Sequence, residues 1–177
     1  MNETAVFDEI AQVSIVVDDI FAFAKRYHDG YGIGPWVVMH FTPENTSDMV
    51  VRDRPEPFEM YLGLCDSLNV QLELIQPISK NTTYWEFLEK HGPGLHHVCM
   101  GSKEGFSSIM EKLRARGHAE RLLGGLDSGG MAFCYVDLTE DLGLIAELVS
   151  PPADFVSPPA AWRYPEAQPP VLKEDVL

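Results

Sequence analysis

Two glutamates lie in a segment that is otherwise mostly apolar. The segment 58–77 (FEMYLGLCDSLNVQLELIQP) reads as two strands around a polar turn, and it contains Glu59 and Glu73. A turn centred near Asp66 predicts that Glu59 lies directly across from Glu73, with the Cβ atoms roughly 4.5–5.5 Å apart. Two carboxylates that close repel one another and must share a proton or a cation. The pattern therefore predicts an acidic pair that holds a positive charge.

A third glutamate, Glu147, lies in the segment 132–151 (AFCYVDLTEDLGLIAELVSP), which has the same length and the same E-L-x-x-P ending. A turn centred near Glu140 predicts that Phe133 lies opposite Glu147. The flanking residues are apolar on both faces, and a buried carboxylate without a partner is costly. A second interpretation stays open, in which these glutamates lie at a sheet edge and reach water or an arginine.

A histidine and a glutamine complete the candidate ligands. His96 and His97 are adjacent on a predicted strand, so only one of them faces a given site. The internal repeat described next aligns His97 with Gln12. One histidine, two carboxylates and a glutamine suit an octahedral-type divalent site with positions open for water or substrate. The predicted ligands are Gln12, Glu73, His97 and Glu147.

The segments that must position these residues occur in two copies. Residues 12–31 read as a strand followed by an amphipathic helix, residues 97–117 repeat that order, and each copy is followed by a hairpin. With a further strand at 36–41, this order predicts an α+β fold of two tandem βαβββ modules that form a curved mixed sheet around a central cleft. We expect a first module at 8–78, a linking helix at 79–92, a second module at 93–151 and a Pro-rich C-terminal tail at 152–177.

Three segments carry no predicted chemistry. Residues 42–57 are polar and bounded by prolines, which predicts a loop beside the first hairpin. The glycine-rich segment 124–130 (GGLDSGG) reads as a flexible connection between helix and hairpin. The tail lacks periodicity and is expected to be extended, draped over the core or over a partner.

Composition excludes several classes of partner. The chain has 13 Lys and Arg against 27 Asp and Glu, a net charge of −14, without a basic run. Nucleic acid and anionic membranes are therefore not expected partners, and no apolar run is long enough to span a bilayer. The acidic start and three cysteines without C-x-x-C spacing favour a reducing cytoplasm.

These motifs resemble the vicinal oxygen chelate superfamily, which contains glyoxalases, bleomycin-resistance proteins and extradiol dioxygenases. The resemblance covers about residues 8–151, and within the superfamily it is most similar to the methylmalonyl-CoA epimerases. Its marks are IAQVSIVVDDI, VQLELIQP, GPGLHHVCM and LIAELVSP. The GPGLHHV element is the most specific to the epimerases.

The resemblance implies roles for single residues. In that family one ligand from each of the four segments holds a divalent ion, which implies Glu73, His97, Glu147 and Gln12; the usual residue at the last position is histidine. Cobalt, manganese, zinc, nickel and iron are not distinguished. The family also places a catalytic base at the position of Glu59, with Glu147 or a water serving the other face of the substrate carbon.

The implied function is an epimerase or racemase, acting as a homodimer. It inverts a carbon α to a carbonyl through a metal-stabilised enolate. The small-molecule substrate is a methylmalonyl-CoA-like thioester or a neutral ketone such as an isoflavanone. The alternatives are a glyoxalase-type lyase or a metal-dependent dioxygenase on the same fold, or a metal-free binding protein.

Overall fold

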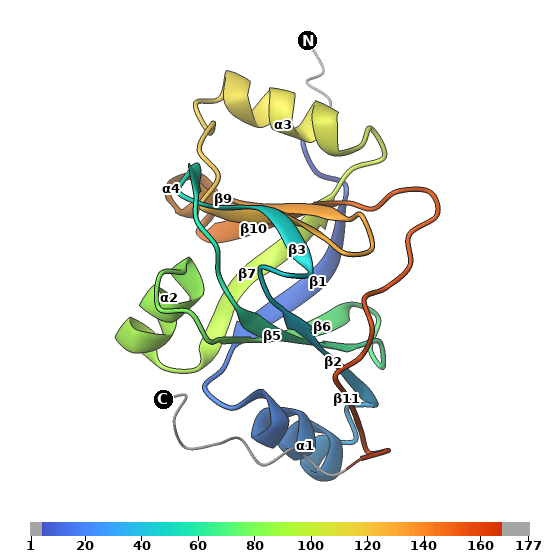
Figure 1. Cartoon of the computed structure of the whole chain (residues 1–177). Helices are drawn as coiled ribbons and strands as arrows, with labels where there is room; N and C mark the ends of the chain where they lie inside the picture. The colour runs from blue at the N-terminus through green and yellow to red at the C-terminus, as the bar shows by residue number, and fades with distance from the viewer. Residues whose placement is uncertain (1–4, 168–177) are drawn as a thin grey trace.

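The computed structural model describes residues 5–167, which form a strongly curved mixed sheet with a helix on the outer side of each arm and another helix between the two arms (Figure 1). Within this range the sheet has eleven strands in the order β11-β2-β5-β6-β1-β7-β10-β9-β8-β3-β4. The predicted α+β class and the curved mixed sheet are confirmed. The first half of the fold consists of β1 (Glu9–Val16), α1 (Ile20–Tyr31), β2 (Trp36–Phe41), β5 (Met60–Cys65) and β6 (Gln71–Pro77).

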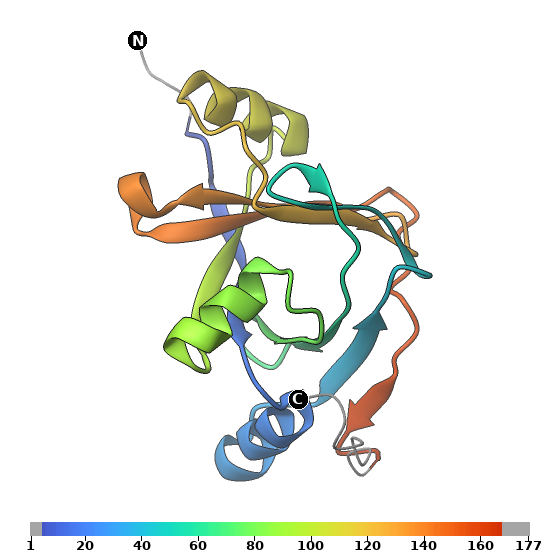
Figure 2. The same cartoon turned by 60° about the vertical axis from the view of Figure 1, so that its left-hand side comes forward.

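The second half repeats this order after a connecting helix, α2 (Thr83–His91). It consists of β7 (Gly94–Gly101), α3 (Phe106–Ala115), β8 (Leu123–Asp127), β9 (Ala132–Leu138), a short α4 (Thr139–Leu142) and β10 (Leu144–Ser150). The halves join where β1 and β7 pair antiparallel. In the turned view, α1 and α3 lie at opposite ends of the molecule, and the two arms of the sheet run between them (Figure 2).

Local sequence signals explain where the helices begin and end. The Asp19 side chain accepts hydrogen bonds from the first backbone amides of α1, and Gly32 ends that helix at a φ of 67°. Thr82 caps α2 in the same way by accepting from the Trp85 amide. These are the polar N-caps and the left-handed glycine stop that such ends favour. None of the helices in the described range is long and apolar enough to cross a membrane.

The prediction that residues 42–57 form a loop is wrong. The segment contains β3 (Thr46–Val51) and β4 (Arg54–Pro55), and β3 pairs with β8 of the second half. Burial of Met49, Val50 and Val51 explains the strand. The segment 42–57 of the first half therefore extends the part of the sheet that the second half forms.

The prediction for residues 124–130 is also wrong. Most of the segment lies in β8, and only its end forms a turn. A Cβ on Gly124 would lie 2.8 Å from the Phe133 carbonyl oxygen, so the glycine allows β9 to approach closely.

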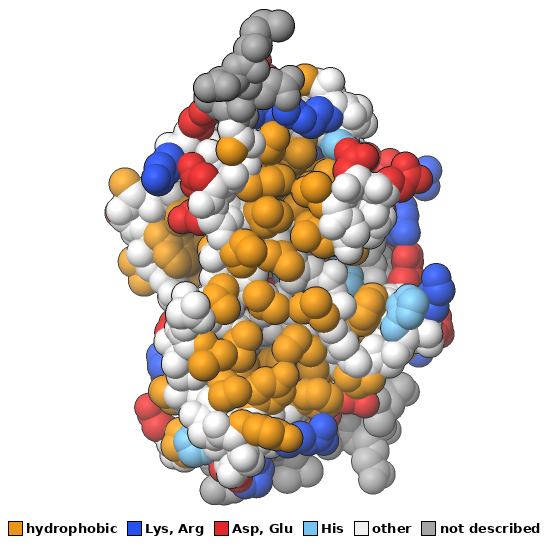
Figure 3. Space-filling view, turned by 180° about the vertical axis from the view of Figure 1, so that it is seen from behind, with side chains coloured by type: hydrophobic (Ala, Val, Ile, Leu, Met, Phe, Trp, Pro, Cys, Tyr) orange, Lys and Arg blue, Asp and Glu red, His pale blue; other side chains and the backbone are white. Residues whose placement is uncertain are grey.

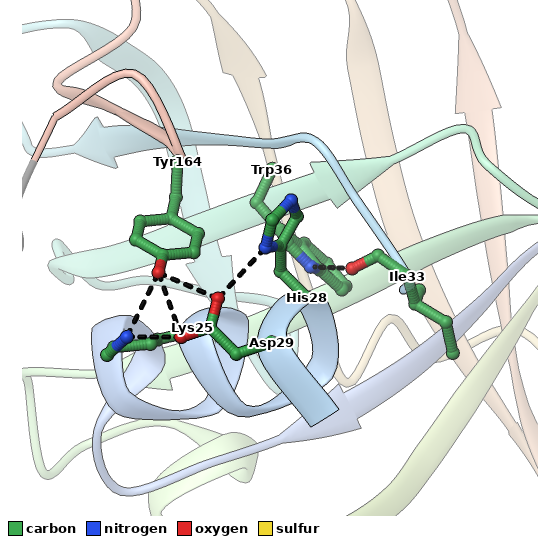
Figure 4. Close-up of polar contacts among 6 residues, drawn as sticks. All are labelled: Lys25, His28, Asp29, Ile33, Trp36 and Tyr164. Carbon is green, nitrogen blue, oxygen red and sulfur yellow. Dashed lines mark hydrogen bonds and ion pairs between the residues drawn. The ribbon is translucent and has the colours of Figure 1, made fainter. Parts of the chain in front are cut away.

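The described part of the tail is extended and crosses the core, as predicted. After β10 the chain runs to β11 (Trp162–Tyr164), which pairs with β2. Figure 4 shows Tyr164 above α1, where its hydroxyl donates to Asp29 Oδ1 at 2.8 Å and accepts from Lys25 Nζ at 3.0 Å. Hydrogen bonds from Lys25, His28 and Tyr164 hold the pKa of Asp29 below its usual range. The tail beyond residue 167 lies outside the described residues.

Candidate metal centre and cavity

Three of the four predicted ligands converge in the core. His97 Nε2 lies 3.1 Å from Glu73 Oε2 and 3.3 Å from Glu147 Oε2. One ligand atom from each of the three side chains lies within 4.8 Å of the others. All three side chains are buried, at 2%, 1% and 4% exposure for Glu73, His97 and Glu147. We call these three residues the acidic triad.

The central strands place the acidic triad. Ser14 on β1 lies in register with Glu73 on β6 and with His97 on β7, so the three residues form one row across the sheet. Ser14 is fully buried in the middle of this row. On β10, Ile145 is the register partner of His97, and Glu147 lies two residues further along, opposite Cys99. The site is therefore built from sequence segments of both halves.

Gln12 lies in the same cavity but is not part of the acidic triad. Its side-chain amide donates to Gln71 Oε1, and Gln71 Nε2 donates to Asp66 Oδ1 at 2.6 Å. In β1 and β6, Gln12 and Gln71 are register partners. Gln12 thus lies next to the acidic triad, hydrogen-bonded to Gln71, and is not one of the converging side chains.

The predicted pairing of Glu59 with Glu73 is wrong. Leu64 lies opposite Glu73, and Glu59 precedes β5, where its carboxylate contacts His40 Nε2 at 2.7 Å. The hairpin turn lies later than Asp66, because all of 66–70 lies outside the ladder. An odd shift in register moves a side chain to the other face of the sheet. Glu59 is therefore absent from the cavity wall.

The second hairpin is also displaced, and this brings in a residue that the sequence reasoning missed. Tyr135, not Phe133, lies opposite Glu147, and its hydroxyl donates to Glu147 Oε1 at 2.7 Å. The short helix α4 and the left-handed Gly143 carry the turn beyond Glu140. The glycine after TEDL is the sequence signal that would have indicated this later turn.

Electrostatics in the site favour a positive charge between the carboxylates. Burial opposes the charged form of His97, but hydrogen bonds to Glu147 and Glu73 outweigh it and raise the pKa of His97 to about 9. Burial, together with the charge of Glu147, raises the pKa of Glu73. With no ion bound, the Nε2 proton of His97 therefore supplies the positive charge between the two carboxylates.

His96 supports the ring of His97 from behind. The two Nδ1 atoms are 2.9 Å apart, and burial with the nearby charge of His97 lowers the pKa of His96 to about 3. A neutral His96 accepts the Nδ1 proton of His97, which leaves Nε2 directed at the two glutamates. Ligand histidines in metal sites commonly donate their second N–H in this way.

The residues present fit a divalent ion. The donor set is one imidazole nitrogen and two carboxylates, which suits borderline and hard divalent ions. Apart from its ion pair with His97, Glu147 Oε2 is buried without a hydrogen-bond partner among the described residues, so it has unused capacity as a ligand. This donor set accommodates cobalt, manganese, zinc, nickel or iron.

The acidic triad lies at one end of a cavity of about 200 Å³. Most of its wall is apolar, and one side consists of side chains from β2 and β5. Glu73, Glu147 and Tyr135 are on its polar end. The apolar lining includes Met39, Phe41, Met60, Leu62, Leu64, Met131, Phe133, Val149, Phe155 and Pro158.

Comparisons with known proteins define the family. A model of the glyoxalase/bleomycin resistance protein/dioxygenase superfamily matches residues 11–135. The chain belongs to this superfamily. A search of curated proteins finds no match.

Solved structures share the fold at low sequence identity. Methylmalonyl-CoA epimerase from Mycobacterium tuberculosis has 18% identity and a TM-score of 0.60, covering 86% of this chain and 93% of that one. A single-residue variant of the Streptomyces coelicolor epimerase, in complex with 2-nitronate-propionyl-CoA, has 17% identity and a TM-score of 0.62, covering 85% and 99%. A methylmalonyl-CoA epimerase in complex with methylmalonyl-CoA and ammonium has 18% identity and a TM-score of 0.62, also covering 85% and 99%.

Proposed function

We propose that this protein is a metal-dependent epimerase or racemase that removes and returns a proton on a carbon α to a carbonyl group. The observation that carries the proposal is the buried acidic triad at the end of an apolar cavity. The fold likeness to methylmalonyl-CoA epimerases supports it. A divalent ion held by Glu73, His97 and Glu147 supplies positive charge for the enolate oxygen.

Glu147 takes the role of the base. It lines the cavity, and its Oε1 accepts a hydrogen bond from the Tyr135 hydroxyl. Its Oε2, which forms an ion pair with His97 and has no hydrogen bond with a described residue, is the oxygen that would bind the ion, so Oε1 keeps a second lone pair for the α-proton. The surrounding apolar side chains exclude water, which strengthens each electrostatic interaction in the site. General base catalysis of this kind contributes typically 10²–10⁴-fold to the rate.

The wall facing the acidic triad limits how the proton returns. The cavity-facing positions of β2 and β5 are Met39, Phe41, Met60, Leu62 and Leu64, and these side chains neither donate nor accept a proton. Glu147 returns the proton to the face from which it came, whereas inversion needs a water on the other face. The expected result is therefore exchange that is faster than inversion.

The test follows both events on one sample. The protein is loaded with Co²⁺ or Zn²⁺ and incubated in D₂O with one enantiomer of 2-methyl-1-indanone or, separately, with methylmalonyl-CoA. NMR measures loss of the α-hydrogen, and chiral chromatography measures inversion. We expect exchange that Glu147→Gln slows by about 10²–10⁴-fold. Absence of exchange with both substrates contradicts the proposed function.

One observation favours a second candidate, a metal-free small-molecule binding protein. The protonated His97 already contacts both carboxylates, and Gln12 is engaged with Gln71. Because these side chains already have partners, the protein needs no ion at this site to remain folded. The candidate predicts ligand affinity that is unchanged by a chelator and no exchange with any metal.

A further inference from the structure

A second buried carboxylate lies in the cavity outside the acidic triad. Asp127, at the end of β8, is 4% exposed and lines the cavity together with Met131 and Phe155. Its Oδ1 accepts hydrogen bonds from the backbone amides of Gly129 and Met131 at 2.9 and 2.8 Å. These bonds shape the turn between β8 and β9.

The other oxygen of Asp127 has no such structural role. Oδ2 is buried and forms no hydrogen bond with a described residue. A buried carboxylate oxygen without a donor costs free energy, because water has been removed and nothing replaces it. The turn explains Oδ1 alone, so Oδ2 is available to a ligand in the cavity.

The strand register places Asp127 at the far end of the cavity. Tyr135, whose hydroxyl donates to Glu147 of the acidic triad, is the register partner of Leu123 on β8. Asp127 lies four residues after Leu123 on the same face of that strand. Four residues of strand span roughly 13 Å. The wall between the two polar ends is apolar, with Phe133 and Val149 contributing to it.

The tail closes this end of the cavity. Phe155, Ser157 and Pro158 line it, and they belong to the segment 151–161, which we call the strap. The strap packs closely on the turn that Asp127 shapes, since a Cβ on Gly129 would lie 2.3 Å from the Val156 carbonyl oxygen and 2.7 Å from the Phe155 ring. The strap thus separates Asp127 from bulk solvent.

We propose that Asp127 is a specificity residue that accepts a hydrogen bond from a hydroxyl group of the substrate. The substrate class is an uncharged, largely apolar ketone whose hydroxyl lies across a ring from its carbonyl group. The carbonyl is held at the acidic triad, and Oδ2 of Asp127 binds the hydroxyl at the other end. This inference rests on the proposed function for the placement of the carbonyl, but the Asp127 contact is tested separately.

The experiment compares three probes on the metal-loaded protein: 1-indanone, 5-hydroxy-1-indanone and 5-methoxy-1-indanone. Calorimetry or ligand-observed NMR measures the Kd of each at about pH 6.5, well below the range in which phenols ionise. We expect the hydroxyl compound to bind about tenfold or more tightly than the other two, as for a hydrogen bond to a charged acceptor.

The protein variant is Asp127→Asn, which retains Oδ1 for the turn and replaces Oδ2 with a donor. We expect it to lose the preference for the hydroxyl compound and to bind 1-indanone within about twofold of wild type. The matched control, Asp154→Asn, alters an exposed strap carboxylate and should retain the preference.

Equal binding of the three probes, no binding of the hydroxyl compound, or a preference that survives in Asp127→Asn overturns the proposal. Deuterium exchange at the indanone α-carbon is recorded on the same samples. A hydroxyl preference without exchange contradicts the proposed function and leaves the Asp127 subsite standing. Exchange without a hydroxyl preference contradicts the Asp127 subsite and leaves the proposed function standing.

Discussion

His97 is the residue on which we expect metal binding to depend. It is the nitrogen donor of the acidic triad, and it contacts both carboxylates. We expect His97→Gln to lose stoichiometric binding of Co²⁺ or Zn²⁺, measured by elemental analysis after dialysis. The matched control is His118→Ala, a histidine paired with Asp141 outside the cavity. Full metal content in His97→Gln would exclude the triad as the site.

Metal binding should also release a proton. In the metal-free site the pKa of His97 is about 9, above its usual value, so at neutral pH its ring is protonated. A metal requires the neutral ring, and binding must displace that proton. We expect metal affinity to rise about tenfold per pH unit below 9 and to level off above it.

Calorimetry in buffers of different ionisation enthalpy measures the number of protons released. One proton near neutral pH is the expected value. A number near zero would mean that His97 is neutral before the metal arrives.

Glu59 and Glu147 are distinguished by their position. Glu59 lies outside the cavity beside His40, and its side chain is 38% exposed, whereas Glu147 is buried within the cavity. We expect Glu59→Gln to keep the wild-type rate of α-hydrogen exchange within about twofold, in contrast to the large loss expected for Glu147→Gln. A loss in Glu59→Gln equal to that in Glu147→Gln would restore the role that the family resemblance implied.

The strap depends on a glycine at its contact with the β8–β9 turn. A Cβ at Gly129 would overlap the Val156 carbonyl oxygen, so Gly129→Ala must displace the strap or the turn. Overpacking of this kind costs typically about 1–3 kcal/mol. Urea unfolding measures the free energy of unfolding, and hydrogen exchange at the strap amides locates the change.

Gly30→Ala is the control for this prediction. Gly30 lies in α1, where a Cβ meets nothing within 4 Å, and alanine favours a helix over glycine by roughly 1 kcal/mol. Gly30→Ala should therefore be neutral or stabilising. Equal stability of the two variants would show that the strap is loosely held.

On the face opposite the cavity, β1 and β7 present apolar side chains to solvent. Three register pairs lie there: Val13 with Val98, Ile15 with Leu95, and Ile10 with Met100. Leu95 is 61% exposed and Ile10 is 58% exposed. The view from behind shows hydrophobic side chains gathered over this side of the molecule (Figure 3). Large exposed apolar patches typically mark contact surfaces.

We propose that this face joins two copies of the chain in a homodimer. Leu95→Asp should convert the dimer to a monomer in analytical ultracentrifugation, because it places a charge among apolar pairs. Leu68→Asp, which alters a 47% exposed leucine in the hairpin between β5 and β6, should remain dimeric. A wild-type protein that is monomeric at all concentrations would contradict the proposal.

The amino-acid sequence determined the repeated order of elements and three of the converging side chains. Alternating apolar residues and helix caps act locally, so the two βαβββ halves were readable from the chain, and the repeat aligned Glu73 with Glu147 and His97 with Gln12. Hairpin register was not readable in this way, since it depends on where the ladder ends. The later turn at 66–70 removed Glu59 from the cavity, and the later turn at Gly143 placed Tyr135 opposite Glu147.

Only the tertiary structure decided the far end of the cavity. The segment 42–57 pairs with β8 through β3, and the strap leads to β11, which pairs with β2. Neither contact has a local sequence signal, because both join segments distant along the chain. For the same reason, the unpartnered oxygen of Asp127 is visible only once the strap and the turn have closed around it.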